Sequence, residues 1–180
     1  WFAHQHLKSF ESELVGCKVR RVETRGKAMI TQLNNRYAIY SHNQLYGRWF
    51  CTHHKEQVQT DRSLRLSITT SRGEAKLYSA SEIAVLTQKE LSSHPLLSRM
   101  GPDVLNHELT TKHVTKILRD SKFCNRQLGA LLTDQAFVAG LGNYLRCEIL
   151  FLCGLHPKRH PKDCDDEIIH QLAEQVIYLP

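Results

Sequence analysis

The sequence of 180 residues carries 24 basic and 18 acidic side chains, a formal net charge of +6. With 41% hydrophobic and 23% charged residues, its composition is that of a globular protein and excludes intrinsic disorder and collagen-like repeats. The longest apolar stretch, Ile149 to Leu155, is far shorter than the ~20 residues needed to cross a bilayer, so no membrane partner is expected. The positive charge permits binding to a phosphate backbone but does not prove it.

The cysteines and histidines show no spacing typical of a metal site. No two of the six cysteines form a C-x-x-C pair, so we predict no metal and no cofactor within this chain. Scattered, unpaired thiols are typical of a reducing compartment, which indicates a cytoplasmic protein.

The first half of the sequence is patterned as short β-strands. Turn formers such as Arg25-Gly26 and Asn34-Asn35 separate segments rich in Val, Ile, Tyr, Phe and Thr. Closely spaced short strands favour an antiparallel sandwich or a barrel-like sheet. The predicted strands span residues 18–23, 28–33, 37–41, 49–52, 64–70 and 75–79.

From about residue 88 the pattern becomes helical. Thr110 is a predicted N-cap of one helix, and Asp163 is a predicted N-cap of another. The segment from His94 to Pro102 is the natural joint between the two halves. The inner faces of the two helices are expected to consist of Val114, Ile117 and Leu118, and of Ile168, Leu172 and Val176.

A first candidate site is the tight basic turn from Glu23 to Ala28. It is interpreted either as a solvated hairpin or as a ligand site. In the second interpretation, Gly26 allows close approach of a backbone and Lys27 contacts a phosphate or serves as an acid.

A second candidate site is the connection that contains Gln44, Leu45 and Tyr46. A hairpin with one buried leucine explains this run structurally. The nucleic-acid interpretation is that an apolar or aromatic wedge replaces a base expelled from a duplex, while the amide bonds the orphaned partner base.

A third candidate site lies between Leu132 and Leu150, where the pattern predicts helix, double turn and helix. Gly140 and Gly142 interrupt the first helical pattern, and Asn143 is placed to start the second helix. Free N–H groups at a helix start bind phosphate, although a plain helix cap explains the same residues. The glycines lack the pattern of a dinucleotide-binding site.

These three segments, with Leu77–Ser81 and Gly101–Leu105, resemble the formamidopyrimidine-DNA glycosylase family in collinear order over the whole chain. The Gln-Leu-Tyr run is similar to the endonuclease VIII branch, which acts mainly on oxidised pyrimidines. The resemblance implies an α+β fold, with an N-terminal antiparallel two-sheet β-sandwich in residues 1–95 and an all-α helix–two-turn–helix domain in residues 96–180.

The resemblance also implies a function in DNA base-excision repair. Family members are bifunctional enzymes that cleave the N-glycosidic bond of a flipped damaged base through a Schiff base and cut the strand by β- and δ-elimination. The implied partner is double-stranded damaged DNA, bound by a monomer. The implied proton donor is Lys27, the residues that fill the void are Gln44, Leu45 and Tyr46, and further DNA contacts come from Arg99 and Asn143.

The sequence departs from the family pattern in three places. The family's N-terminal proline nucleophile with its following glutamate is absent, and so is its C-terminal zinc finger, where zinc is expected. Arg48 stands where family members often carry an apolar residue. We therefore expect an internal fragment that binds DNA weakly and is inactive alone. The alternative is a non-catalytic nucleic-acid-binding helix–two-turn–helix protein.

Overall fold

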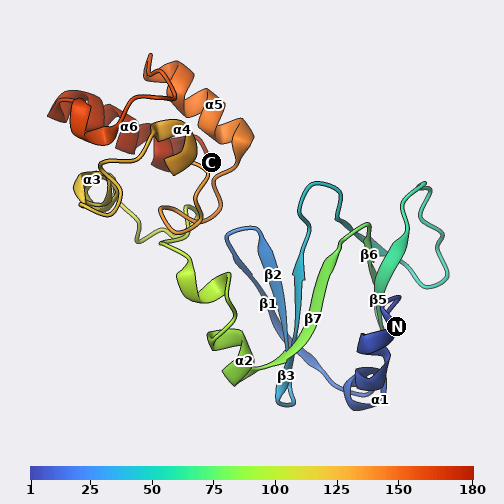
Figure 1. The fold of residues 1–180 in the computed structure, drawn as a ribbon. Helices are drawn as coiled ribbons and strands as arrows, with labels where there is room; N and C mark the ends of the chain where they lie inside the picture. The colour runs from blue at the N-terminus through green and yellow to red at the C-terminus, as the bar shows by residue number, and fades with distance from the viewer. The chain divides into compact units, whose positions relative to one another are not determined.

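The computed structural model describes all residues from 1 to 180 (Figure 1). The chain divides into two compact units, Trp1–His94 and Pro95–Pro180. The first unit contains the strands and the second contains the longer helices, as the α+β prediction requires.

The first unit opens with a 3-10 helix, η1 (Gln5–Phe10), which continues into the short helix α1 (Glu11–Leu14). The six predicted strands are all present close to their predicted bounds. A seventh strand, β7, and the short helix α2 (Gln88–Ser92) were not predicted. The strands are β1 (Val19–Arg25), β2 (Ala28–Leu33), β3 (Tyr37–His42), β4 (Arg48–Thr52), β5 (Leu64–Thr70), β6 (Gly73–Tyr78) and β7 (Glu82–Thr87).

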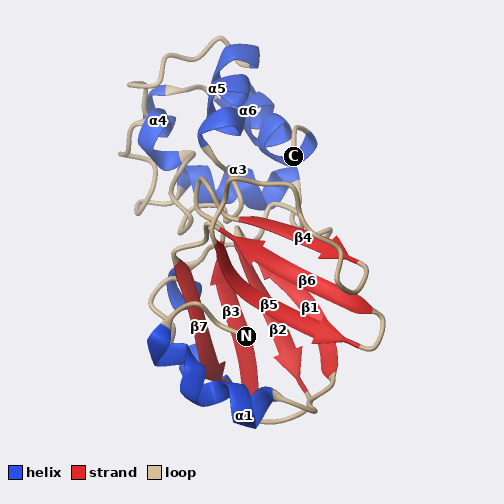
Figure 2. Cartoon of the chain, turned by 90° about the vertical axis from the view of Figure 1, so that its right-hand side faces the viewer, coloured by secondary structure: helices blue, strands red, loops and turns tan.

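The strands form two antiparallel sheets (Figure 2). One sheet has the order β1-β2-β3-β7, and the other has the order β4-β6-β5. Side chains alternate between the two faces of a strand, so alternate residues of one strand can contribute to the same core. The core of the unit draws on both sheets and includes Phe2, Leu7, Leu33, Tyr37, Ile39, Leu66, Leu77, Ile83 and Val85. The predicted two-sheet architecture is thus confirmed.

The second unit is built from helices around a separate core. Its helices are α3 (Thr111–Arg119), α4 (Leu128–Leu131), α5 (Asn143–Leu152) and α6 (Asp166–Tyr178), with short 3-10 helices η2 (Leu97–Arg99) and η3 (Pro161–Asp163). Thr110 caps α3 as predicted, because its hydroxyl accepts the N–H of His113. Fully buried core members include Val114, Leu118, Leu128, Leu131, Leu132, Phe137, Leu141, Ile149, Leu172 and Val176.

The N-cap predicted at Asp163 is wrong. Pro161 opens the 3-10 helix η3, and Asp163 ends it. Asp165 caps α6 instead, because its carboxylate accepts the N–H of Ile168 at 2.9 Å. The helix therefore begins later than expected, and Ile169 takes the fully buried place that was predicted for Ile168.

The first helix of the helix–two-turn–helix also lies earlier than predicted. α4 ends at Leu131, and the following residues form turns. Side chains of two polar residues cause this, because they bond backbone groups that a helix would use. The Asp134 carboxylate accepts the N–H of Ala136 at 2.8 Å, and the Gln135 amide oxygen accepts the N–H of Gly140 at 2.9 Å.

None of the helices combines the length and the hydrophobicity that crossing a bilayer requires.

Candidate nucleic-acid interface

The pairing of β1, β2, β3 and β7 brings three connections to one end of the four-stranded sheet. Arg25 pairs with Ala28, Ala28 pairs with His42, and His42 pairs with Glu82. The turn at Lys27, the loop after His42 and the segment before Glu82 therefore lie at the same end, where Figure 1 shows the three connections. Two of the three predicted sites and the Leu77–Ser81 segment meet here.

The loop from Asn43 to Gly47 is a tight turn that exposes its middle residues. The N–H of Gly47 donates to the carbonyl oxygen of Asn43 at 2.7 Å. A side chain at position 47 would collide with the Asn43 backbone, since an added Cβ would lie 2.6 Å from its Cα. Leu45 is 88% exposed and Tyr46 is 68% exposed. The explanation of this run as a hairpin with one buried leucine is therefore wrong.

Three contacts hold the turn in this shape. The N–H of Gln44, whose φ is 50°, donates to Nδ1 of His42 at 3.1 Å. The hydroxyl of Ser81 donates to Oε1 of Gln44 at 2.7 Å. The guanidinium of Arg62 donates to the carbonyl oxygen of Tyr46. Polar contacts on both sides of Leu45 thus order the backbone that displays the two apolar side chains.

Sequence reasoning missed the supporting residues Ser81 and Arg62. Ser81 lies 37 positions from Gln44, and Arg62 lies 16 positions from Tyr46. Neither Ser81 nor Arg62 belongs to a sequence motif that would indicate its hydrogen-bond partner. The two contacts with the turn are therefore visible only in the folded structure. Ser81 ends a segment that carried the family resemblance, but that resemblance gave it no role.

Lys27 follows Gly26 in the β1–β2 turn and is exposed. Its amine forms no ion pair with a carboxylate of the chain. Partial desolvation lowers the pKa of Lys27 below the ordinary value for a lysine, because burial penalises the charged ammonium form. The structure thus presents, beside the apolar turn, an amine that gives up its proton more readily than a free lysine.

Arg48, which follows the exposed turn, contacts an aromatic ring with its charged group. Its guanidinium lies over the ring of Phe50, at 5.3 Å from the ring centroid. Such a cation–π contact attracts the Arg48 charge to the face of this ring.

In the helical unit, Asn143 is the first residue of α5. The preceding residue, Gly142, supplies no side chain to cap the helix, and Asn143 is exposed. The first N–H groups of a helix have no partner within the helix, and the helix dipole adds positive potential there. The side-chain amide of Asn143 has no hydrogen-bond partner within the chain. The arrangement suits a phosphate group.

Gln135 connects the Asn143 segment to the Arg99 segment. Its side-chain amide donates to the carbonyl oxygen of Leu141 at 2.9 Å, and its own carbonyl accepts the N–H of Gly101 at 2.9 Å. Gly101 permits this approach, because an added Cβ would lie 2.5 Å from the carbonyl oxygen of Phe137. Sequence reasoning assigned no role to Gln135.

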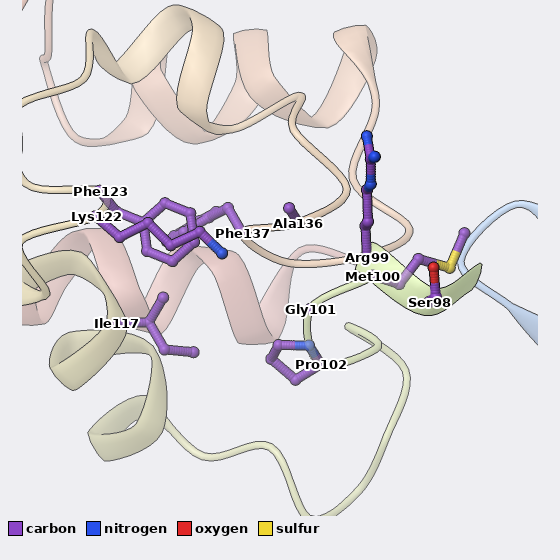
Figure 3. A pocket seen from close by; sticks show the side chains of 10 residues that line it. All are labelled: Ser98, Arg99, Met100, Gly101, Pro102, Ile117, Lys122, Phe123, Ala136 and Phe137. Atoms are coloured by element: carbon purple, nitrogen blue, oxygen red, sulfur yellow. The ribbon is translucent and has the colours of Figure 1, made fainter. Parts of the chain in front are cut away.

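Arg99 ends η2 at the edge of a pocket of about 650 Å³ (Figure 3). Apolar groups of Met100, Phe123 and Phe137 help to line this pocket. Figure 3 shows the Arg99 side chain pointing away from the aromatic rings, while the Lys122 amine lies beside them. The position of Arg99 therefore leaves its guanidinium available to a ligand outside the pocket.

The residues present do not fit a zinc site. The chain contains no group of three or more His, Cys, Asp or Glu side chains arranged to hold a metal ion. All six cysteines are free thiols.

The fold defines an α+β protein that joins an antiparallel two-sheet unit to a helix–two-turn–helix unit. The model of the formamidopyrimidine-DNA glycosylase N-terminal domain matches residues 2–83, and that of the formamidopyrimidine-DNA glycosylase H2TH domain matches residues 100–179. The chain is 48% identical over 180 residues to Endonuclease 8 of Enterobacter sp. (strain 638) and 47% identical to Endonuclease 8 of Escherichia coli O157:H7. In both cases the alignment covers 100% of this chain and 68% of the relative. The chain belongs to the formamidopyrimidine-DNA glycosylase family, as the resemblance predicted.

Solved structures share this fold. Wild-type Lactococcus lactis Fpg, in complex with DNA that contains N7-benzyl-Fapy-dG, matches with a TM-score of 0.81 at 19% identity, covering 98% of this chain and 67% of that chain. The same species' formamidopyrimidine DNA glycosylase, bound non-covalently to DNA with an AP site, matches with a TM-score of 0.78 at 20% identity, covering 95% and 65%. At these identities the likeness concerns the fold.

The shifted pKa of Lys27 can be measured directly. We expect its amine to titrate with a midpoint below the ordinary lysine value of about 10.4, because desolvation disfavours its charged form. Nuclear magnetic resonance of the side-chain 13Cε–1H groups against pH measures this midpoint, and Lys27→Arg identifies the resonance by removing it. A midpoint at or above the ordinary value contradicts the described environment.

Proposed function

We propose that this protein acts in DNA base-excision repair, as a DNA glycosylase with AP lyase activity that removes oxidised pyrimidines from double-stranded DNA. The observation that carries the proposal is the exposed Leu45–Tyr46 turn, with the Gln44 amide beside it and the Lys27 amine at the same sheet end. The family assignment and the names of its relatives support the same activity.

In the first step, the damaged nucleotide leaves the duplex and the turn enters the gap. Extrusion costs a few kcal/mol, least for a base that is already poorly stacked. Leu45 and Tyr46 replace the lost stacking, and the Gln44 amide bonds the base that has lost its partner. Part of the selectivity for damage thus arises before any pocket contacts the base.

In the later steps, we assign Lys27 a proton transfer during elimination and a phosphate contact. Its lowered pKa favours proton donation compared with an ordinary lysine. We do not assign Lys27 the attack on the sugar C1′. The resemblance implies an N-terminal amine for that step, whose pKa near 8 leaves a larger unprotonated fraction at neutral pH than a lysine has.

Arg99 and Asn143 contact phosphates in this proposal. Arg99 offers a charged fork of donors, and Asn143 adds its amide to the free N–H groups at the start of α5. Such contacts fix the position of the protein on the duplex and carry little sequence preference. Binding through them weakens as salt rises.

We further propose that the protein works as a monomer in the bacterial cytoplasm. Six free thiols fit a reducing compartment, and the named relatives come from bacteria. A zinc finger, as the resemblance implies, would need ligands beyond those that residues 1–180 provide.

The wedge assignment predicts unequal effects on two substrates. In a protein that spans the full length of the relatives, Leu45→Ala or Tyr46→Ala should slow base release from an oxidised-pyrimidine duplex more than strand cleavage at a pre-formed abasic site, since the second substrate needs no extrusion of a base. Single-turnover kinetics on both duplexes measure this difference. Leu105→Ala, which removes an exposed leucine of the helical unit, is the matched control.

Equal losses on the two substrates would contradict the wedge assignment. Trapping with borohydride on the same duplex separates the enzyme from the alternative: a covalent adduct shows Schiff-base chemistry, whereas binding without an adduct favours a non-catalytic nucleic-acid-binding protein.

The phosphate contact at Asn143 predicts a loss of affinity that does not depend on sequence. Asn143→Ala should weaken binding to damaged duplexes by about tenfold, because one hydrogen bond to a charged group is lost. Fluorescence anisotropy on several duplexes with different flanking sequences measures the loss, with Asn125→Ala as an exposed control. A loss confined to one sequence context would argue against the phosphate assignment.

A further inference from the structure

We propose that Ser81 is a positioning residue that fixes the orientation of the Gln44 side-chain amide, so that its NH2 group serves as the donor to the unpaired base. The inference deepens the proposed function and rests on it. It starts from one contact, in which the Ser81 hydroxyl donates to Oε1 of Gln44 at 2.7 Å. The other end of the amide, Nε2, has no partner within the chain.

The position of Ser81, whose hydroxyl bonds the Gln44 amide, is fixed by its neighbours at the end of the sheet. Ser81 directly precedes β7, whose first residue, Glu82, pairs with His42 of β3. The Glu82 carboxylate also accepts the hydroxyl of Tyr40 at 3.2 Å, and the side chain of Ala80 is buried. Ser81 therefore stands between two anchored neighbours at the sheet end that carries the exposed turn.

The backbone of Gln44 limits the amide from the other side. Its φ of 50° is in the left-handed region, and its N–H donates to His42. The side chain therefore leaves the backbone in a direction set by the turn, and Ser81 fixes the rotation of the terminal amide group. The two constraints together leave one end of the amide for a ligand.

The orientation matters because the two ends of an amide are opposite in hydrogen-bonding character. The oxygen accepts, and the nitrogen donates two hydrogens. An amide that is free to turn over can adapt to any base edge, since every base edge offers donors and acceptors. A net hydrogen bond of about 0.5–1.5 kcal/mol biases the orientation by about two- to tenfold. The fixed amide therefore favours bases that place an acceptor at the contact, and Ser81 sets the preference for the opposite base.

Binding to duplexes with a tetrahydrofuran abasic analogue tests this directly. The 180-residue chain is titrated at one fixed low salt concentration against four duplexes, in which the analogue lies opposite A, C, G or T. We expect the wild-type affinities to differ among the four, and Ser81→Ala to reduce that spread by about two- to tenfold. Ser81→Thr, which keeps the hydroxyl, should restore it, and Ser12→Ala, which removes an exposed serine of α1, should leave it unchanged.

A spread that is absent in the wild type, or that is the same in Ser81→Ala, overturns the inference. A general loss of structure would lower all four affinities together and would not be restored by threonine. The proposed function fails separately: if the chain does not prefer the analogue duplexes to undamaged DNA, or if Leu45→Ala does not weaken that preference, the wedge itself is absent and the inference falls with it.

A second measurement needs no DNA. The side-chain 13Cδ resonance of Gln44 reports hydrogen bonding at its oxygen. We expect this resonance to shift in Ser81→Ala and to stay near its wild-type position in Ser81→Thr. A resonance that does not respond to Ser81→Ala would show that the hydroxyl does not hold the amide in solution.

Discussion

The antiparallel register of β2, β3 and β7 is the constraint on which the sheet unit's site depends. Because Ala28 pairs with His42 and His42 pairs with Glu82, three connections that are distant in sequence emerge at one sheet end. A slip of one residue would turn the side chains of a strand to the opposite face. The buried core fixes the register, since residues such as Ile39 and Val85 must face it. Packing thus determines where the amine and the apolar turn are placed.

The exposed turn retains apolar surface that folding leaves in contact with water. Leu45 and Tyr46 lie outside both cores although the chain is long enough to bury them. Burying a leucine side chain contributes about 1.5–3 kcal/mol, and stacking an aromatic ring on a base contributes about 1–3 kcal/mol. These gains are similar in size to the few kcal/mol that extrusion of a nucleotide costs. If the turn enters a duplex as proposed, this balance leaves little surplus for an intact, well-stacked pair and favours extrusion from a weakened one.

Local patterns in the sequence predicted much of this arrangement, but not the contacts that refine it. Strand β3 follows from a short segment rich in Tyr and Ile after the turn formers Asn34-Asn35, and the cap at Thr110 follows from one hydroxyl beside an apolar-periodic segment. The cap at Asp163 failed because Pro161 starts a separate short helix first. The hydrogen bond between Ser81 and Gln44 joins two connections across 37 positions, so no local pattern contains it. Residue patterns offered ligand roles for Lys27, Gln44 and Asn143 beside plain structural explanations. The family resemblance favoured the ligand roles and added Arg99, and the structure adds the surroundings of these residues.

The most direct measurement asks whether the turn occupies the gap in a duplex. The base analogue 2-aminopurine is placed beside a tetrahydrofuran site, and its emission is followed as the chain is added to saturation. If Leu45 and Tyr46 stack in the gap, the emission falls for the wild-type chain, and it stays near that of free DNA for a chain in which both residues are alanine. The same fall for both chains would show that the duplex is bound without the turn inside it, and would contradict the account.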